Sequence, residues 1–280
     1  LSEPGIRSGV RVGDNVFAGY ATGDGSESAY VCLFALAYDQ PADVPIRLWA
    51  EDLAGNRTEV AFPCKTFPQD FRTRHIEVTD RIIELVSEDI LANTRKVSRK
   101  ETPLETFVEI NSTYRRITNR RLSELTSSSV NKLLWDQPFV QLTNSKVESR
   151  FADHRIYTYE SEEVDRQTHL GFDLASLAQS PVEASNSGNV VFADYLGIYG
   201  NTVILDHGLG LFSLYGHLST ISVERGNSVS RGEELGRTGQ TGLAAGDHLH
   251  YSMLVEDVQV NPLEWWDPKW VQDHILSKLR

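Results

Sequence analysis

The chain has 280 residues, 40% of them hydrophobic and 24% charged, and a formal net charge of −12. This composition is typical of a globular protein of two or three compact domains, and no run of about 18 apolar residues marks a membrane-spanning helix. Because phosphate groups are bound by clustered Lys and Arg, the acidic balance argues against nucleic acid as a partner. Residues 1–14 contain no basic start followed by an apolar core, so no signal peptide is visible.

The first expected domain, residues 1–72, reads as β-structure. Short apolar or alternating runs at 30–38, 45–52 and 58–64 are separated by turn residues, which favours a small β-sandwich of immunoglobulin-like type. Cys32 and Cys64 lie in two of these runs, too far from the histidines for a Cys-rich zinc site. They would form a cross-strand disulfide if the protein is exported, and two reduced core thiols are the alternative.

The second expected domain, residues 73–135, has a helical pattern. Apolar residues recur with helical spacing on one face of a first helix, namely Ile82, Ile83, Val86 and Ile90. A second helix is predicted to begin at Thr102, because this N-cap residue is followed by Pro103 and by Glu105, as in a capping box. We therefore expect a helical linker domain between two β-rich parts.

From residue 136 onward the pattern returns to short strands. Apolar runs at 188–197, 200–218 and 248–261 are interrupted by Gly and Asn, which predicts an antiparallel, sheet-dominated domain over residues 136–270. Residues 271–280 are left as a C-terminal tail. The expected fold is thus mainly β with a helical insert.

Histidines are concentrated in this last domain, where six of the eight lie between residues 154 and 250. In a strand, residues two apart point the same way, so His248 and His250 are predicted to face one side of a sheet. By the same rule His169 and Asp173 share a face, with Gly171 between them leaving room. His217 lies at the end of a long apolar run.

Two imidazoles, one carboxylate and a water are a recurring ligand set for catalytic zinc. Each motif by itself is weak, since a lone H-x-H is more often polar filler of a strand than a ligand pair. Their conjunction in one glycine-rich β segment is far more informative. It predicts a metal site with further histidines available for proton transfer.

Three segments carry a family resemblance: T-H-L-G-F-D at 168–173, Y-G-H-L at 215–218 and G-D-H-L-H at 246–250. They resemble the signature motifs of the lysostaphin-type (LytM-like) zinc metallopeptidases, and the similarity runs from about Pro138 to Trp266. The resemblance implies a Zn²⁺-dependent endopeptidase that cuts peptide bonds in bacterial peptidoglycan, in cross-links or stem peptides. It also implies a location in the periplasm or elsewhere in the cell envelope.

The resemblance assigns roles to five residues. His169, Asp173 and His250 would bind Zn²⁺, whereas His217 and His248 would be the catalytic pair. One of that pair would accept the proton of the attacking water and the other would stabilise the oxyanion, and the family pattern does not settle which. His207 also matches a common family position, with a structural role as the alternative, and no role is expected for His75, His154 and His274.

Two departures from the family pattern concern the segment before His169. Ala152 stands where the family usually has Gly, and residues 157–167 form a longer, more acidic stretch than expected. This stretch would be either a wall of the substrate groove or a solvent loop. Loops before His169 and around 239–247 would build the groove, where Gly239, Gly242 and Gly246 permit close approach of a peptide.

Other readings of the same fold are a non-catalytic activator of cell-wall hydrolases and a wall-binding module in which zinc is structural. The complete ligand set argues against the activator, and the two unliganded histidines beside the metal argue against the wall-binding module. The expected partners are peptidoglycan peptides, and the protein is expected to be a monomer. Because about 135 residues precede the peptidase-like part, they are also expected to fold across the groove and hold the enzyme inactive.

Overall fold

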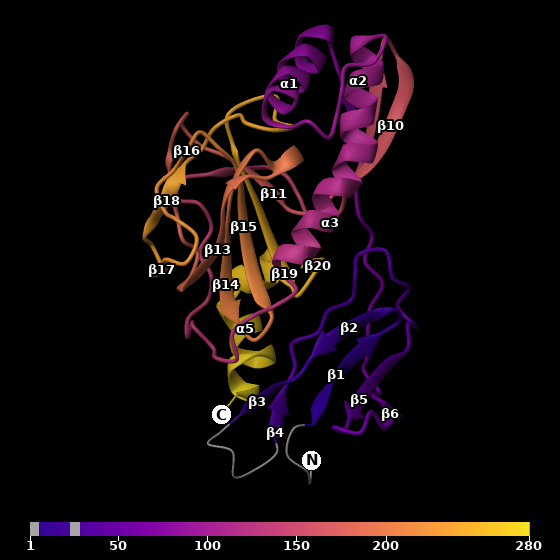
Figure 1. The fold of residues 1–280 in the computed structure, drawn as a ribbon, viewed down its shortest axis with the longest axis vertical. Helices are drawn as coiled ribbons and strands as arrows, with labels where there is room; N and C mark the ends of the chain where they lie inside the picture. The colour runs from indigo at the N-terminus through magenta and orange to yellow at the C-terminus, as the bar shows by residue number, and fades with distance from the viewer. Residues whose placement is uncertain (1–5, 23–28, 280) are drawn as a thin grey trace.

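The computed structural model describes residues 6–22 and 29–279, and it is mainly β with few helices (Figure 1). Its first strands are β1 (Arg7–Val12), β2 (Asn15–Ala18), β3 (Tyr20–Thr22), β4 (Ala29–Val31), β5 (Ile46–Glu51) and β6 (Arg57–Ala61). They form one four-stranded antiparallel sheet in the order β2-β1-β5-β6 and a separate ribbon of β3 and β4.

The expected immunoglobulin-like sandwich is not confirmed in this part of the chain. Val10 and Phe17, on the β1–β2 half of the sheet, are almost fully buried, whereas Leu48 and Val60, in the same cross-strand row, are 39% and 55% exposed. A second sheet covering the whole apolar face would bury all four. Cys32 and Cys64 are both free thiols, with Cys64 exposed, so the structure contains no disulfide between them.

The helical pattern is confirmed by α1 (Asp80–Asn93), α2 (Pro103–Glu109) and α3 (Arg115–Leu125), with the π-helical turn η1 (Ile110–Tyr114) joining the last two. Thr102 caps α2 through a hydrogen bond from the Glu105 amide, and the Glu105 side chain accepts one from the Thr102 amide, which completes the predicted capping box. The buried residues of α1 include Ile83, Val86 and Ile90, on the predicted face.

A strand before α1 connects this region to the next. Strand β7 (Thr73–Glu77) pairs in parallel with β9 (Asp153–Tyr159), and β9 pairs antiparallel with β10 (Glu162–His169). The acidic stretch 157–167 is therefore part of a β-hairpin and not an irregular solvent loop. Residues about 80 positions apart in the chain thus share one three-stranded sheet.

The largest sheet contains β8 (Lys146–Ser149), β11 (Phe172–Ala175), β13 (Gly188–Tyr195), β14 (Asn201–Gly208), β15 (Leu211–Leu218), β17 (Ser228–Val229), β19 (Leu249–Val255) and β20 (Val258–Val260). Its order is β17-β13-β14-β15-β19-β11-β8, with β20 on β19, and every pairing is antiparallel. A small sheet beside it joins β12 (Pro181–Glu183), β18 (Glu234–Arg237) and β16 (Thr220–Ile221).

The chain ends in short helices that pack on the large sheet. They are α4 (Pro262–Trp266), α5 (Pro268–His274) and the 3-10 turn η3 (Leu276–Lys278). Another 3-10 turn, η2 (Gly197–Tyr199), lies between β13 and β14. Val271 is fully buried and Ile275 nearly so, in one apolar cluster with Trp265. Residues 271–279, expected to be a tail, thus contribute to the core. No helix in the described part of the chain is long and apolar enough to cross a membrane.

Candidate metal centre

Three neighbouring strands of the large sheet bring the predicted site residues together. Asp173 on β11 lies opposite His250 on β19, and His250 lies opposite Gly216 on β15, next to His217. His169 reaches the same point from the end of β10. The single strand predicted over 169–173 is therefore wrong, because the chain turns at Leu170 and Gly171 between β10 and β11.

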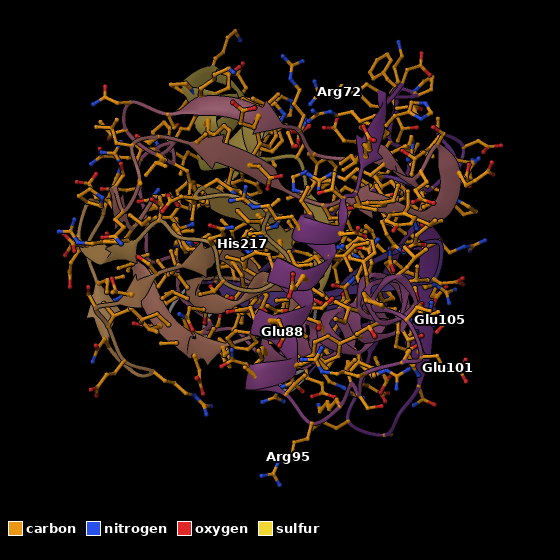
Figure 2. The ribbon with its side chains drawn as sticks, turned by 90° about the horizontal axis from the view of Figure 1, so that it is seen from above. Arg72, Glu88, Arg95, Glu101, Glu105 and His217 are labelled. Carbon is orange, nitrogen blue, oxygen red and sulfur yellow. The ribbon has the colours of Figure 1, made fainter. Side chains whose placement is uncertain are left out.

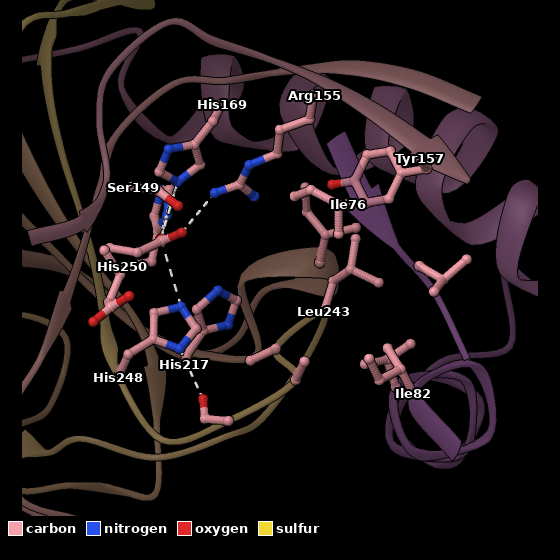
Figure 3. Close-up of a pocket in the computed structure, with 18 of the residues that line it drawn as sticks. Ile76, Ile82, Ser149, Arg155, Tyr157, His169, His217, Leu243, His248 and His250 are labelled. Atoms are coloured by element: carbon pink, nitrogen blue, oxygen red, sulfur yellow. Dashed lines mark hydrogen bonds and ion pairs between the residues drawn. The ribbon is translucent and has the colours of Figure 1, made fainter. Parts of the chain in front are cut away.

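The predicted ligand atoms converge on one point (Figure 3). Asp173 Oδ1 lies 2.9 Å from His169 Nε2 and 3.1 Å from His250 Nδ1, and these two ring nitrogens lie 3.1 Å apart. All three residues are buried. Gly171 is required here, because a Cβ on it would lie 2.7 Å from His250 Nε2 and 2.6 Å from Ser252 Oγ.

Hydrogen bonds on the outer ring nitrogens fix which nitrogen faces this point. His169 Nδ1 donates to the Arg150 carbonyl at 3.0 Å. The Ser252 hydroxyl donates to the Leu170 carbonyl and therefore accepts from His250 Nε2 at 2.9 Å. His169 Nε2, His250 Nδ1 and Asp173 Oδ1 are then three acceptors facing one another. Such a set does not satisfy itself by hydrogen bonds, but it fits a divalent cation such as Zn²⁺.

The electrostatics keep the ligand set in the form that binds a cation. Burial lowers the pKa of His169, and it lowers that of His250 to about 4, so both imidazoles are neutral near pH 7. Burial opposes ionisation of Asp173, but the interactions with His169 and with the Arg155 guanidinium more than offset this effect and hold its pKa well below the usual range. Neutral imidazoles and a carboxylate are the protonation states that metal binding requires.

The two remaining predicted histidines stand beside this cluster. His248 Nε2 lies 3.5 Å from Asp173 Oδ1, and the rings of His217 and His248 are 4.8 Å apart between centroids. Each donates its Nδ1 proton to a main-chain carbonyl, that of Thr241 for His217 and that of Gly246 for His248, both at 2.8 Å. Burial, with help from the neighbouring imidazoles, lowers the pKa of His217 well below its usual value. Burial opposes protonation of His248 too, but the nearby Asp173 carboxylate raises its pKa.

A cavity of about 420 Å³ opens on these side chains. One end holds the five predicted site residues, and the other end has an apolar wall that includes Ile76, Ile82, Tyr157 and Leu243 (Figure 3). Tyr157 comes from the β9–β10 hairpin, so the acidic stretch does form part of the wall. Ile76 and Ile82 come from β7 and α1, ahead of the peptidase-like part.

Helix α1 is also tied to the loop that forms the cavity rim. Asp89 Oδ2 accepts hydrogen bonds from the Gly242 amide at 2.6 Å and from the Tyr195 hydroxyl at 2.7 Å. Leu243 packs against apolar residues of α1 and α2. Figure 2, seen from above, shows α1, marked by Glu88, lying across the face on which His217 is found.

The glycines of this rim have different functions from those expected. A Cβ on Gly239 would lie 2.4 Å from the Ser219 amide, and one on Gly242 would lie 2.4 Å from the Gly200 amide. These two glycines are needed for close packing within the protein. Only Gly246 faces open space in the cavity, as expected for approach of a ligand.

The other histidines lie outside the cluster. His207 is fully buried, with Nδ1 donating to the Ser187 carbonyl and Nε2 near the Ser213 hydroxyl, both at 2.7 Å. His75, His154 and His274 are exposed. Sequence reasoning did not single out Arg155, which forms an ion pair with Asp173. Its only sequence signal was its place in the segment before His169 that departs from the family pattern.

Comparison with known proteins agrees with this geometry. Residues 167–262 match the model of peptidase family M23. The chain carries an M23 peptidase domain. The four clustered histidines and Asp173 all fall within the matched residues, whereas Arg155 does not.

Two relatives that align with the M23 domain are named as peptidases. The chain is 42% identical over 95 residues to the DD-carboxypeptidase/endopeptidase Mpg of Neisseria meningitidis, and 40% identical over 96 residues to the peptidoglycan DD-endopeptidase ShyA of Vibrio cholerae. Each alignment covers 34% of this chain and 22% of the relative. The chain thus aligns with less than a quarter of the length of these relatives.

The fold likeness extends beyond the M23 domain. A crystal structure of a putative peptidase M23 from Pseudomonas aeruginosa aligns with 96% of this chain, and the alignment covers 91% of that chain. The TM-score is 0.56 and the sequence identity 20%. The likeness therefore concerns the fold, and it includes the strands and helices ahead of the M23 domain.

Proposed function

We propose that this protein is a zinc-dependent endopeptidase that hydrolyses peptide bonds of bacterial peptidoglycan, in cross-links or stem peptides. The observation that carries the proposal is the convergence of His169, Asp173 and His250, with His217 and His248 beside them in one cavity. The name of the relative Mpg supports peptidase activity, and that of ShyA, a peptidoglycan DD-endopeptidase, supports peptidoglycan as the substrate. A place in the cell envelope, periplasmic or outside the cell, follows from that substrate.

His169 Nε2, His250 Nδ1 and Asp173 Oδ1 would hold the metal. When bound, zinc would lower the pKa of a water molecule and polarise the scissile carbonyl. His217 and His248 each present Nε2 to the cavity, because their Nδ1 protons are held by main-chain carbonyls. One of them, as the neutral imidazole, would accept the proton of the attacking water at Nε2, and the other, as the protonated imidazolium, would donate from Nε2 to the developing oxyanion and the leaving amine.

The shape of the cavity suits a peptide substrate. The polar end provides the groups that act on an amide, and the apolar wall beyond it provides contact for aliphatic side chains. The acidic net charge of the chain leaves nucleic acid out of the proposal. The protein is proposed to act as a monomer.

The alternatives are a non-catalytic activator of cell-wall hydrolases and a wall-binding module. Neither uses a complete ligand set together with two further imidazoles whose tautomers are fixed toward the cavity. The variant His250→Ala discriminates between an activator and an enzyme. An activator would retain its effect on other hydrolases in this variant, whereas an enzyme would lose its activity with its metal.

The experiment that tests the function measures zinc content and hydrolysis of purified, cross-linked peptidoglycan by the whole chain. About one zinc per chain, as a three-ligand site implies, together with release of peptide products that requires His250, is the expected result. Bound zinc without hydrolysis would contradict the peptidase proposal unless activity appears when the helical region is loosened. Absence of zinc would contradict the metal site.

We also propose that the helical region restrains the enzyme. The support is the double hydrogen bond of Asp89 to Gly242 and Tyr195, which fastens α1 to the cavity rim, and the position of Ile82 in the cavity wall. Deleting the region is a poor test, because β7 would be lost and β9 would lose its parallel partner. A substitution within α1 leaves that sheet intact and is the better test.

A further inference from the structure

The two carboxylate oxygens of Asp173 contact different partners. Asp173 Oδ1 faces the three imidazoles of His169, His248 and His250 at 2.9, 3.5 and 3.1 Å. Asp173 Oδ2 accepts a hydrogen bond from Arg155 at 2.6 Å. The side chains of Arg155 and Asp173 are only 15% and 12% exposed. The guanidinium therefore lies inside the cavity, against a predicted metal ligand (Figure 3).

Arg155 reaches this position from outside the M23 domain. It lies on β9, opposite Gln167 of β10 and, on the other side, opposite Arg74 of β7. Residues 167–262 contain all three predicted ligands, but they do not contain Arg155, its own strand β9 or the flanking strand β7. The region ahead of the M23 domain thus holds in place a charged group that touches the site.

Burying a guanidinium costs free energy, and here the cost is not fully offset. Arg155 Nε is buried and has no hydrogen-bond partner among the described residues. A buried ion pair is in general weak evidence for stability, because desolvation of the two charges offsets much of their attraction. The arrangement is better explained by what Arg155 does to Asp173. It fixes the plane of the carboxylate, occupies Oδ2 and leaves only Oδ1 for a cation.

We propose that Arg155 is a positioning residue for the Asp173 ligand: it holds the carboxylate so that a bound metal is ligated by Oδ1 only. The inference rests on the metal site of the proposed function. With Oδ2 withheld, the carboxylate takes one coordination position, and a position stays open for water or substrate. Without Arg155, Oδ2 is free to bind the metal as well.

The test compares Arg155→Gln, Arg155→Lys and Arg74→Gln in the whole chain. Arg74→Gln is the matched control, because Arg74 lines the same cavity and is the β7 partner of Arg155. Its side chain contacts the Glu148 carbonyl and the Ser149 hydroxyl, and it touches no ligand. Removing it therefore removes one positive charge from the cavity without releasing Asp173.

Two measurements are made on each variant: zinc affinity, by competition with a chromogenic chelator, and the visible absorption spectrum of the Co²⁺-substituted protein. We expect Arg155→Gln to lower zinc affinity about 10- to 100-fold and to alter the Co²⁺ spectrum toward a higher coordination number. Arg155→Lys keeps the charge and restores part of the affinity. Arg74→Gln matches the unaltered chain in both measurements.

Several results would overturn the inference. One is an Arg155→Gln protein with unaltered zinc affinity and Co²⁺ spectrum, and another is an equal change in Arg74→Gln. A metal-saturated Arg155→Gln enzyme in which only KM rises would make Arg155 a substrate-binding residue. If Arg155→Gln does not fold, Arg155→Lys decides, because it keeps the buried carboxylate paired. A chain that binds zinc but cleaves no peptidoglycan, even when the helical region is loosened, refutes the peptidase proposal and leaves this comparison intact.

Discussion

His217 donates a hydrogen bond from Nδ1 to the main-chain carbonyl of Thr241, at 2.8 Å. The backbone of His217 is in the left-handed region, with φ of 62°, where a residue with a Cβ is strained. The contact with Thr241 holds the imidazole with Nε2 toward the cavity. A strained backbone in a buried residue that lines the candidate site is consistent with selection for chemistry over stability.

Replacement of His217 by Ala should separate catalysis from metal binding. His217 contributes none of the three converging ligand atoms, so the variant should retain zinc. Loss of a proton-transfer group should lower kcat for peptidoglycan hydrolysis about 10²- to 10⁴-fold. His274→Ala is the control, because His274 is exposed on α5, and it should match the unaltered chain. Loss of zinc from the His217 variant would instead make His217 a ligand.

Gly171→Ala should damage the metal site without removing a ligand. The added Cβ would lie 2.7 Å from His250 Nε2 and 2.6 Å from Ser252 Oγ, so it would disturb the hydrogen bond that sets the His250 tautomer. We expect zinc affinity to fall about tenfold or more, measured by chelator competition. Gly246→Ala is the matched control for affinity, because a Cβ there meets nothing within 4 Å. Equal affinity in both variants would show that His250 adapts freely.

Asp89→Ala tests whether α1 restrains the enzyme. The substitution removes the acceptor for the Gly242 amide and the Tyr195 hydroxyl, and hydrogen bonds to a charged group contribute about 1.5–3 kcal/mol. If this contact favours a closed state, hydrolysis should rise about tenfold or more, since about 1.4 kcal/mol is a factor of ten. The control is Glu88→Ala, next in sequence, whose carboxylate pairs with Arg99 on the surface. A fall in activity would mean that α1 is a wall of the substrate site and not a restraint.

The clustering of the candidate ligands was predictable because its information is local. The resemblance of three short motifs grouped His169, Asp173 and His250, whose side chains do converge, although the single strand expected over 169–173 was wrong. The i, i+2 spacing of His248 and His250 brings both imidazoles to the Asp173 carboxylate. The capping box at Thr102 was predictable for the same reason. Gly171 was expected to leave room between two polar side chains, and it does leave room for His250. It lies after the end of β10, however, and not within a strand.

What the sequence did not predict depends on contacts between distant segments. The pairing of β7 with β9, the ion pair of Arg155 with Asp173 and the bond of Asp89 to Gly242 leave no periodic trace in the chain. The apolar run 30–38 illustrates another limit. Only its start is strand, and the rest packs irregularly on the core, because an apolar run signals burial without specifying backbone conformation.

The buried His207 should make the stability of the fold depend on pH. Burial lowers its pKa from 6.5 in the unfolded chain to about 4 in the folded one. Above pH 6.5 both states are neutral, and the full stability is present. As the pH falls from 6.5 toward 4, the unfolded chain binds a proton that the folded chain does not. The free energy of unfolding therefore falls, by roughly 3 kcal/mol in total.

The measurement is urea unfolding of the metal-free protein at several pH values between about 7 and 5, where most carboxylates remain ionised. His207→Gln is the comparison variant, because Gln keeps a polar side chain opposite the Ser187 carbonyl and the Ser213 hydroxyl but does not titrate. The other buried histidines titrate in both proteins, so their contribution cancels in the difference. The unaltered chain should lose stability more steeply with acid than the variant. Parallel pH profiles would mean that His207 is protonated as readily in the folded protein as in the unfolded chain.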